Sequence, residues 1–245
     1  MRPVNLFSKS IPSHLFHAHE KAFQRMEQHR LWDLLLTREL PAHVFCELIQ
    51  QDQWYLLGSS YAIQHLSKRI RMEQAHHKDA DRHANELGLF AQDLQVWGNK
   101  IQETYLNRTP QSLWFKPRKI CPVIAEYRAN TFMKTKTGTL AEAIAINAAC
   151  PYIYHQRISD KIKKMPLDVK YPEHKFLESA YNPKFIGHAR LMEEIANAWT
   201  MHLTPHEKEK ANQAFNESMQ HEIDFFDYIL GLASSNQNIN IPCIR

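Results

Sequence analysis

Three side chains in this 245-residue chain could do chemistry, and they occupy positions where a helical protein normally carries apolar residues. Asp52 and Glu222 each fall within a stripe of apolar residues that recur at helical spacing. A carboxylate on a core-facing stripe is unfavourable unless it has partners or a function. Cys150 falls in a third segment that is almost entirely apolar. Together they predict a shared site inside a helical domain. The stripe of Asp52 holds Phe45, Leu48, Ile49, Tyr55, Leu56, Ile63 and Leu66, and that of Glu222 holds Phe215, Met219, Phe225, Phe226 and Ile229.

The chemistry that these residue types suggest is nucleophilic attack by the thiol of Cys150. A thiol becomes a nucleophile when a neighbour takes its proton, and Asp52 or Glu222 could accept it while the other carboxylate handles protons on the substrate. Tyr55 and Tyr154 share helix faces with Asp52 and Cys150, and their hydroxyls could orient a ligand. The residues alone leave open a simpler structure, in which Cys150 is only buried and Asp52 anchors a helix end.

The elements that must position these residues are predicted to be helices. Glycine is scarce, with 6 in 245 residues, and no run alternates long enough to indicate a strand. Apolar periodicity and capping residues such as Thr139 and Thr204 predict helices over about 13–29, 31–36, 42–69, 80–105, 123–134 and 139–154, a short one after 172, and two more over 183–203 and from 204. No linker or repeat is evident, so we expect an all-α fold with one domain over 1–245, its tails at 1–12 and 234–245.

Two local features leave alternatives. Pro151 directly follows Cys150, so the helix either kinks and opens room beside the thiol or ends there. A cluster of His76, His77 and His83 near Asp79 could suggest a metal, but its polar surroundings favour a solvated helix start.

Composition excludes several classes of function. The formal net charge is only +4 and no basic stripe is interleaved with aromatics, so we expect no nucleic-acid partner. No run of about 18 apolar residues predicts a membrane span. The first ten residues lack the apolar core of a signal peptide. The four cysteines show no CxxC pairing, which favours a cytoplasmic protein with free thiols and no metal.

Three motifs together resemble the TenA family, also called thiaminase II, which has a haem-oxygenase-like helical fold. They are QDQWYL (51–56), TLAEAIAINAACPYIY (139–154) and HEIDFF (221–226), and the resemblance extends over about 31–230. It implies that Cys150 is the nucleophile and that Asp52 and Glu222 are catalytic. It further implies substrate binding by Tyr55, Tyr127, Tyr154, Tyr181 and Phe225.

The activity implied by the resemblance is hydrolysis of a C–N bond in salvage of the pyrimidine half of thiamin, with no cofactor and a small pyrimidine as substrate. The resemblance also implies a homotetramer. Whether thiamin or its aminomethyl-pyrimidine breakdown product is preferred stays open. The chain departs from the family in having Ala149 and Pro151 around the cysteine, Phe226 in place of a tryptophan, and a longer stretch between Asp52 and Tyr127.

Three rival functions remain on the same fold. A di-iron oxidase would need histidine and aspartate where the last helix has Ser218, Glu222 and Phe225. A cofactorless oxidase like the pyrroloquinoline quinone synthase would need a cationic pocket, for which Arg157 is the candidate. A non-catalytic regulatory or binding protein would leave the inward carboxylates and thiol without a joint purpose.

Overall fold

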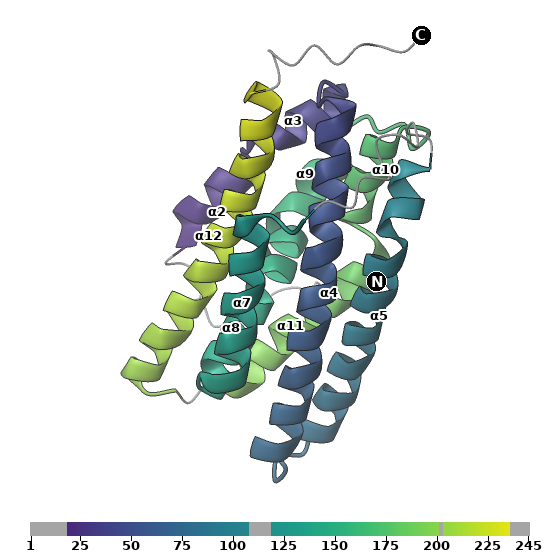
Figure 1. The fold of residues 1–245 in the computed structure, drawn as a ribbon. Helices are drawn as coiled ribbons and strands as arrows, with labels where there is room; N and C mark the ends of the chain where they lie inside the picture. Colours follow the sequence, from purple (N-terminus) through teal and green to yellow (C-terminus); the bar gives the residue numbers. More distant parts are fainter. Residues whose placement is uncertain (1–18, 108–118, 201–202, 236–245) are drawn as a thin grey trace, which may run out of the picture.

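The computed structural model describes residues 19–107, 119–200 and 203–235, and within these ranges the chain is helical with no strand. The all-α prediction is therefore confirmed (Figure 1). The long helices are α4 (Ala42–Glu73), α5 (Ala80–Leu106), α7 (Pro122–Thr137), α8 (Leu140–Ile153), α11 (Pro183–Thr200) and α12 (Pro205–Ser235). The shorter ones are α2 (Glu20–Glu27), α3 (Arg30–Thr37), α9 (Ser159–Lys163), α10 (Pro172–Ser179) and a π-helical turn, η2 (Tyr154–Ile158).

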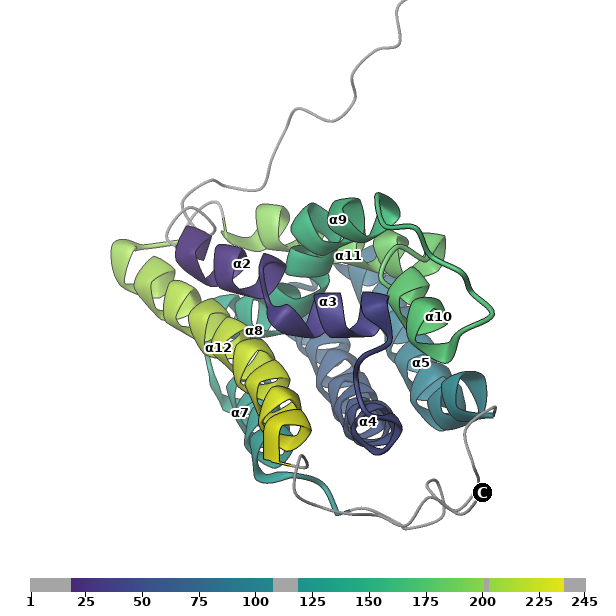
Figure 2. The same cartoon turned by 90° about the horizontal axis from the view of Figure 1, so that it is seen from above.

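Helix α8 lies at the centre of the bundle. Seen from above, it lies among α4, α7, α11 and α12, the long helices that pack against it (Figure 2). Its apolar residues face both sides of the molecule, since Ile146 and Ile153 belong to one core cluster and Ile144 to a second. Full burial of one such side chain stabilises the fold by roughly 1.5–3 kcal/mol. This central position explains why the segment is apolar around its whole circumference.

Capping residues set the ends of the helices. Thr139 begins α8 with a capping box, in which Thr139 Oγ1 accepts from the Glu142 amide at 3.2 Å and the Thr139 amide donates to Glu142 Oε2 at 2.9 Å. Thr204 and Glu207 repeat the box at the start of α12. The observed bounds extend α4 to residue 73, end α11 at 200 and carry α12 to 235. The predicted start of the first helix, near 13, lies outside the described residues, as does most of both predicted tails.

The helix does not end at Pro151. It continues as α8 to Ile153, passes through the π-helical turn and goes on as α9. Ser159 Oγ lies 2.7 Å from the carbonyl oxygen of Tyr154 and 2.8 Å from that of Ala180, so the turn is fastened to the loop between α10 and α11. A π-helical turn is rare and often lies beside a functional site.

The predicted solvated helix start at the histidine cluster is wrong for His83. Its side chain is buried, Nε2 lies 3.3 Å from Glu194 Oε1, and its ring lies 6.0 Å from that of Trp199. Both partners belong to α11, more than 100 residues further along the chain. The polar residues next to His83 in the sequence could not show that α11 covers the start of α5.

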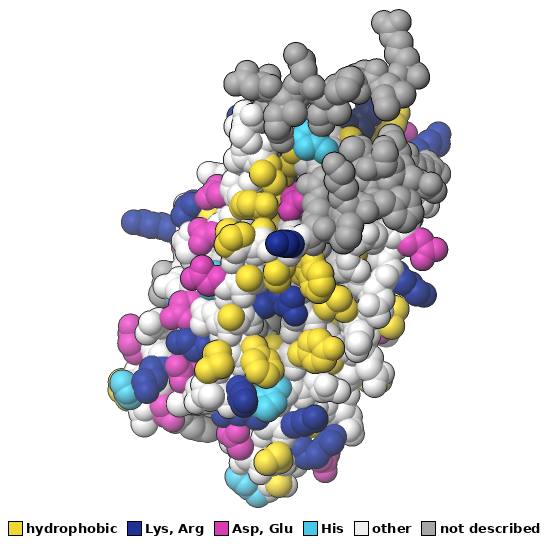
Figure 3. Space-filling model, viewed as in Figure 1, with side chains coloured by type: hydrophobic (Ala, Val, Ile, Leu, Met, Phe, Trp, Pro, Cys, Tyr) yellow, Lys and Arg dark blue, Asp and Glu magenta, His cyan; other side chains and the backbone are white. Residues whose placement is uncertain are grey.

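Exposed apolar side chains gather on α4 and α7. Hydrophobic side chains gather along the middle of the face seen in the space-filling view (Figure 3). Trp54 and Tyr61 of α4 and Phe132 of α7 are exposed. The guanidinium of Arg128 lies over the Trp54 ring at 5.7 Å, and a side chain at Gly58 would collide with it. No described helix is both long enough and apolar enough to cross a membrane.

Candidate active site

A cavity of about 360 Å³ lies between the long helices and opens beside α5, α10 and α11. The volume falls within the roughly 300–1,000 Å³ typical of small-molecule sites. Its open end carries the exposed residues Lys100 and Asn182, whereas its interior is lined by side chains of α4, α7, α8 and α12. The bundle thus provides an enclosed space suited to one small ligand.

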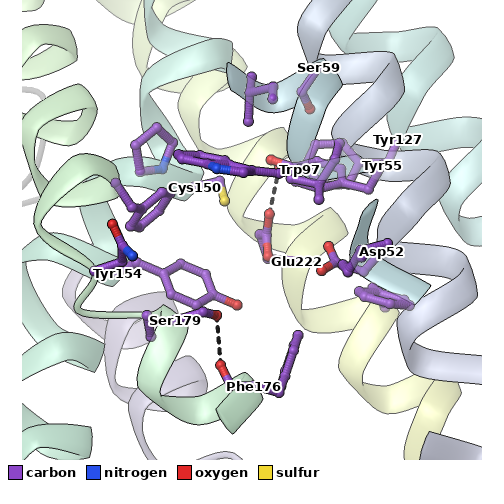
Figure 4. Close-up of a pocket in the computed structure, with 18 of the residues that line it drawn as sticks. Asp52, Tyr55, Ser59, Trp97, Tyr127, Cys150, Tyr154, Phe176, Ser179 and Glu222 are labelled. Carbon is purple, nitrogen blue, oxygen red and sulfur yellow. Dashed lines mark hydrogen bonds between the residues drawn. The ribbon is translucent and has the colours of Figure 1, made fainter. Parts of the chain in front are cut away.

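Asp52, Cys150 and Glu222 line this cavity from α4, α8 and α12, although they are far apart in sequence (Figure 4). The cavity wall also includes four of the five residues expected to bind substrate, which are Tyr55, Tyr127, Tyr154 and Phe225. The structure therefore brings seven of the eight expected residues together.

Tyr181 is not part of the cavity wall. It lies in the short turn between α10 and α11, half-buried against the core, while its neighbours Ala180 and Asn182 line the cavity. Adjacent residues in a turn point in different directions, so the match of one tyrosine by sequence could not fix which side chain faces inward.

Glu222 is held by a hydrogen-bonded group on α7 and α12. The hydroxyl of Tyr127 donates to Glu222 Oε1 at 2.9 Å and lies 2.8 Å from Ser218 Oγ, one turn earlier on α12. The Tyr55 hydroxyl is 3.5 Å from that of Tyr127. The Tyr127 ring stacks on His221 with centroids 5.0 Å apart. Because its partners are fixed on both sides, the carboxyl group of Glu222 has a defined orientation.

The two carboxyl groups are perturbed in the same direction. Burial raises the pKa of Asp52 from 3.8 to about 7, and the negative charge of Glu222 adds to the shift. Burial also raises the pKa of Glu222, against the opposing effect of hydrogen bonds from Cys150, Tyr127 and Tyr55. Asp52 is half-buried and borders the cavity. Asp52 can therefore exchange a proton close to neutral pH, and Glu222 holds its proton more tightly than an exposed glutamate does.

The thiol of Cys150 is protonated at rest. Burial and the charge of Glu222 raise its pKa well above the ordinary value, while a hydrogen bond with Tyr55 lowers it. Attack by sulfur thus requires a base that takes the proton during the reaction. Glu222 interacts directly with the thiol, and its own raised pKa makes it a stronger base than an exposed glutamate.

Several cavity residues were not predicted from the sequence. Helix α5 contributes Phe90, Trp97 and Lys100, and α10 contributes Phe176 and Ser179. An aromatic residue on an amphipathic helix has the same sequence pattern whether it faces a core or a cavity, so no signal distinguished them. The stretch between Asp52 and Tyr127, which the sequence shows to be longer than in the TenA family, contains α5. Its length was the one sign in the sequence that the cavity wall differs there.

Positive charge is sparse at this site. Lys100 is the cation among the described residues of the cavity wall, and it is exposed. Arg157 instead pairs with Glu20 at 2.7 Å and does not line the cavity. Within the described ranges, no three His, Cys, Asp or Glu side chains come together in a way that could hold a metal ion.

The arrangement of helices places this chain in a known structural class, the haem-oxygenase-like all-helical fold. Within that class it has the fold of TenA homologues. It is similar to the TenA homologue protein from P. horikoshii OT3, with a TM-score of 0.71, 15% identity, and coverage of 90% of this chain and 98% of that one. A TenA homologue from Pyrococcus furiosus superposes with a TM-score of 0.70 at 16% identity, covering 89% of this chain and 98% of that one.

A third similar structure is described as a TenA family transcription regulator from Silicibacter sp. TM1040. It gives a TM-score of 0.70 at 17% identity and covers 89% of this chain and 95% of its own. No protein-family model matches this sequence. No curated protein matches it either. At these identities the similarity establishes the fold.

Proposed function

We propose that this protein is a TenA-type hydrolase that cleaves the C–N bond of an aminomethyl-pyrimidine or of thiamin. The observation that carries the proposal is the meeting of one thiol and two carboxyl groups in a single enclosed cavity. Cys150 has Glu222 beside it as a base, and three tyrosines surround the pair. Covalent catalysis by a thiol needs such a base but no metal.

In the first step, sulfur of Cys150 bonds to an electron-poor carbon of the pyrimidine ring while its proton passes to Glu222. Asp52 hydrogen-bonds a ring nitrogen or the ring amino group and balances the charge that develops there. Its pKa of about 7 allows it to give or accept a proton at neutral pH. The ring is held between aromatic side chains, including Tyr55 and Phe225.

In the second step, the C–N bond to the leaving amine breaks, and the amine takes a proton from the newly protonated carboxyl group. Water then adds to the exocyclic carbon that carried the amine and gives its proton to the Glu222 carboxylate. The C–S bond breaks as this proton passes to sulfur, which restores the thiol. The carboxyl group of Glu222 serves first as base and then as acid, so Asp52 remains free to bind the ring.

The resemblance to TenA proteins further leads us to propose a homotetramer that acts in the cytoplasm without a cofactor. The exposed Trp54, Tyr61 and Phe132 provide apolar surface for contact between subunits. Light scattering on the purified protein measures the assembly directly, and a monodisperse monomer would refute it.

The test of the function is turnover of 4-amino-5-aminomethyl-2-methylpyrimidine and of thiamin by the purified protein, followed as release of ammonia or thiazole. The matched control is Cys121→Ser, because Cys121 caps α7 through its sulfur and serine is a good capping residue. Turnover lost in Cys150→Ser but kept in Cys121→Ser supports the proposal. Saturable binding of pyrimidine without turnover would instead indicate a binding or regulatory protein.

A further inference from the structure

Tyr127, whose hydroxyl donates to Glu222, packs against a histidine that the proposed chemistry does not use. Tyr127 is 2% exposed, and the ring of His221 stacks on its ring with centroids 5.0 Å apart and planes inclined by 21°. His221 does not line the cavity, whereas Tyr127 and Glu222 do. Any effect of His221 on the reaction must therefore pass through Tyr127.

Three residues on one face of α12 contact Tyr127. Its hydroxyl lies 2.8 Å from Ser218 Oγ and donates to Glu222 Oε1 at 2.9 Å (Figure 4). Its ring meets His221, and positions 218, 221 and 222 share a helix face because they are three and four residues apart. The ring of Tyr55 on α4 lies 5.0 Å from that of Tyr127. The hydroxyl contacts hold only the tip of the side chain, so the neighbouring rings must keep its body in place.

Asn130 determines which nitrogen of His221 carries the proton. Its side-chain nitrogen lies 3.1 Å from Glu217 Oε2 and 3.1 Å from His221 Nε2. A carboxylate can only accept, so the atom that faces Glu217 must be the amide nitrogen, which donates two protons and accepts none. His221 Nε2 is therefore an acceptor, and the ring is a neutral imidazole with its proton on Nδ1.

The charged groups around His221 leave it neutral. Glu126 of α7 and Glu217 and Asp224 of α12 favour the protonated imidazole, but burial outweighs them and lowers the pKa of His221 below its ordinary value. Lys134 Nζ lies 3.4 Å from Glu217 Oε2 and offsets part of that negative charge. A neutral ring can stack on a tyrosine without bringing a positive charge toward the catalytic carboxyl groups.

The ionisation of Glu222 depends on where Tyr127 lies. Burial raises the pKa of Glu222, whereas hydrogen bonds from Cys150, Tyr127 and Tyr55 lower it. Asp52 faces Glu222 from α4, and the two carboxyl groups carry like charge when ionised. If the Tyr127 ring turned, Glu222 would lose one donor and its pKa would rise further. The position of this ring therefore sets how readily Glu222 gives up its proton.

We propose that His221 is a positioning residue: held by Asn130 as a neutral imidazole, it keeps the Tyr127 ring where the hydroxyl donates to Glu222. The inference rests on the proposed function in taking Glu222 as the base. It adds to the site a residue that acts on the reaction without touching the substrate.

The test measures the ionisation of Glu222 without substrate, by carbon-13 NMR of labelled glutamate carboxyl groups, and Glu222→Gln identifies the signal. His221→Ala removes the ring and should raise the titration midpoint by about one pH unit, the equivalent of one hydrogen bond. His221→Phe keeps a neutral ring in the same place and should keep the wild-type midpoint. The control is His206→Ala, which changes an exposed histidine of the same helix and should have no effect.

The contribution of Asn130 is tested by a double-mutant cycle. Asn130→Ala releases His221 and should raise the midpoint of Glu222 in the wild-type background. In the His221→Phe background the same change should have no effect, because phenylalanine offers Asn130 no acceptor. Equal effects in both backgrounds would show that Asn130 does not act through His221. Nitrogen-15 NMR of the wild-type imidazole should show the proton on Nδ1 at pH 7.

A wild-type midpoint in both His221→Ala and Asn130→Ala, or a positively charged His221 at pH 7, would overturn the positioning role. If His221→Ala does not fold, the Asn130 cycle decides the question. Turnover is measured on the same proteins, and at a pH below the midpoint His221→Ala should lose about tenfold in kcat with little change in KM. A shifted titration without any pyrimidine turnover would reject the proposed function and keep the positioning residue. Normal turnover with an unshifted titration would reject the role of His221 alone.

Discussion

Ionisation of Asp52 should destabilise the folded protein as the pH rises through neutrality. Burial and the charge of Glu222 raise the pKa of Asp52 from 3.8 to about 7 in the folded state. Between these two values the folded state binds more protons at this site than the unfolded state does. The free energy of unfolding therefore falls with increasing pH across this window, the opposite of the behaviour of a salt-bridged aspartate.

The size of the effect follows from the two pKa values. A shift from 3.8 to about 7 corresponds to a loss of about 4 kcal/mol between the fully protonated and fully ionised limits. Over the range from pH 5 to pH 8 the loss from this one group is about 2.6 kcal/mol. This is an upper value, because water in the cavity would stabilise the ionised form.

Asp52→Asn removes the titration while keeping the shape of the side chain. The assay is urea unfolding of both proteins at pH 5 and at pH 8, followed by circular dichroism. We expect the variant to gain about 2.6 kcal/mol relative to wild type between the two pH values. Asp160→Asn on α9, whose carboxylate is 71% exposed, is the control and should show no such gain. A gain below about 0.5 kcal/mol for Asp52→Asn would refute the assigned desolvation.

Three more variants test the roles of the cavity residues. Cys150→Ser should lose turnover by orders of magnitude in a steady-state assay while its stability changes by about 1 kcal/mol, and substantial remaining activity would show that another group attacks. Glu222→Gln should melt near the wild-type temperature and still bind pyrimidine, but lose most of kcat; a variant that melts early yet turns over normally when folded would make Glu222 a structural anchor. Tyr127→Phe removes the 2.9 Å hydrogen bond to Glu222, so it should lower stability by about 1–3 kcal/mol and move the acidic limb of the pH–rate profile upward, because that bond holds the pKa of Glu222 down. An unmoved acidic limb would contradict the role of Glu222 as the base.

The sequence predicted the part of the cavity wall that carries the carboxyl groups, because these residues depart from the apolar pattern of their helices. A carboxylate within a stripe of apolar residues, such as Asp52 or Glu222, can be recognised from the sequence alone. The order of the helices was also predictable, since capping residues and prolines mark their starts. Trp97 and Phe176 obey the pattern of an ordinary core, so their place in the cavity wall depends on how α5 and α10 approach the other helices.

The remaining differences have the same physical origin in long-range packing. His83 is buried because α11 covers it. The π-helical turn after Ile153 likewise has no marker in its five residues.

The π-helical turn has a consequence for how this chain tolerates insertions and deletions. Such a turn behaves like an α-helix into which one extra residue has been inserted, so residues after it are rotated by roughly 100° relative to an uninterrupted helix. Here it separates Cys150, which lines the cavity, from Ile162, which is buried in the core. Loss of a single residue between 154 and 158 would rotate one segment relative to the other. Either Cys150 would turn away from the cavity or Ile162 would turn away from the core. Changes of length before Thr139 or after Lys163 leave both faces in place, so relatives that keep the thiol should vary in length there and not within the turn.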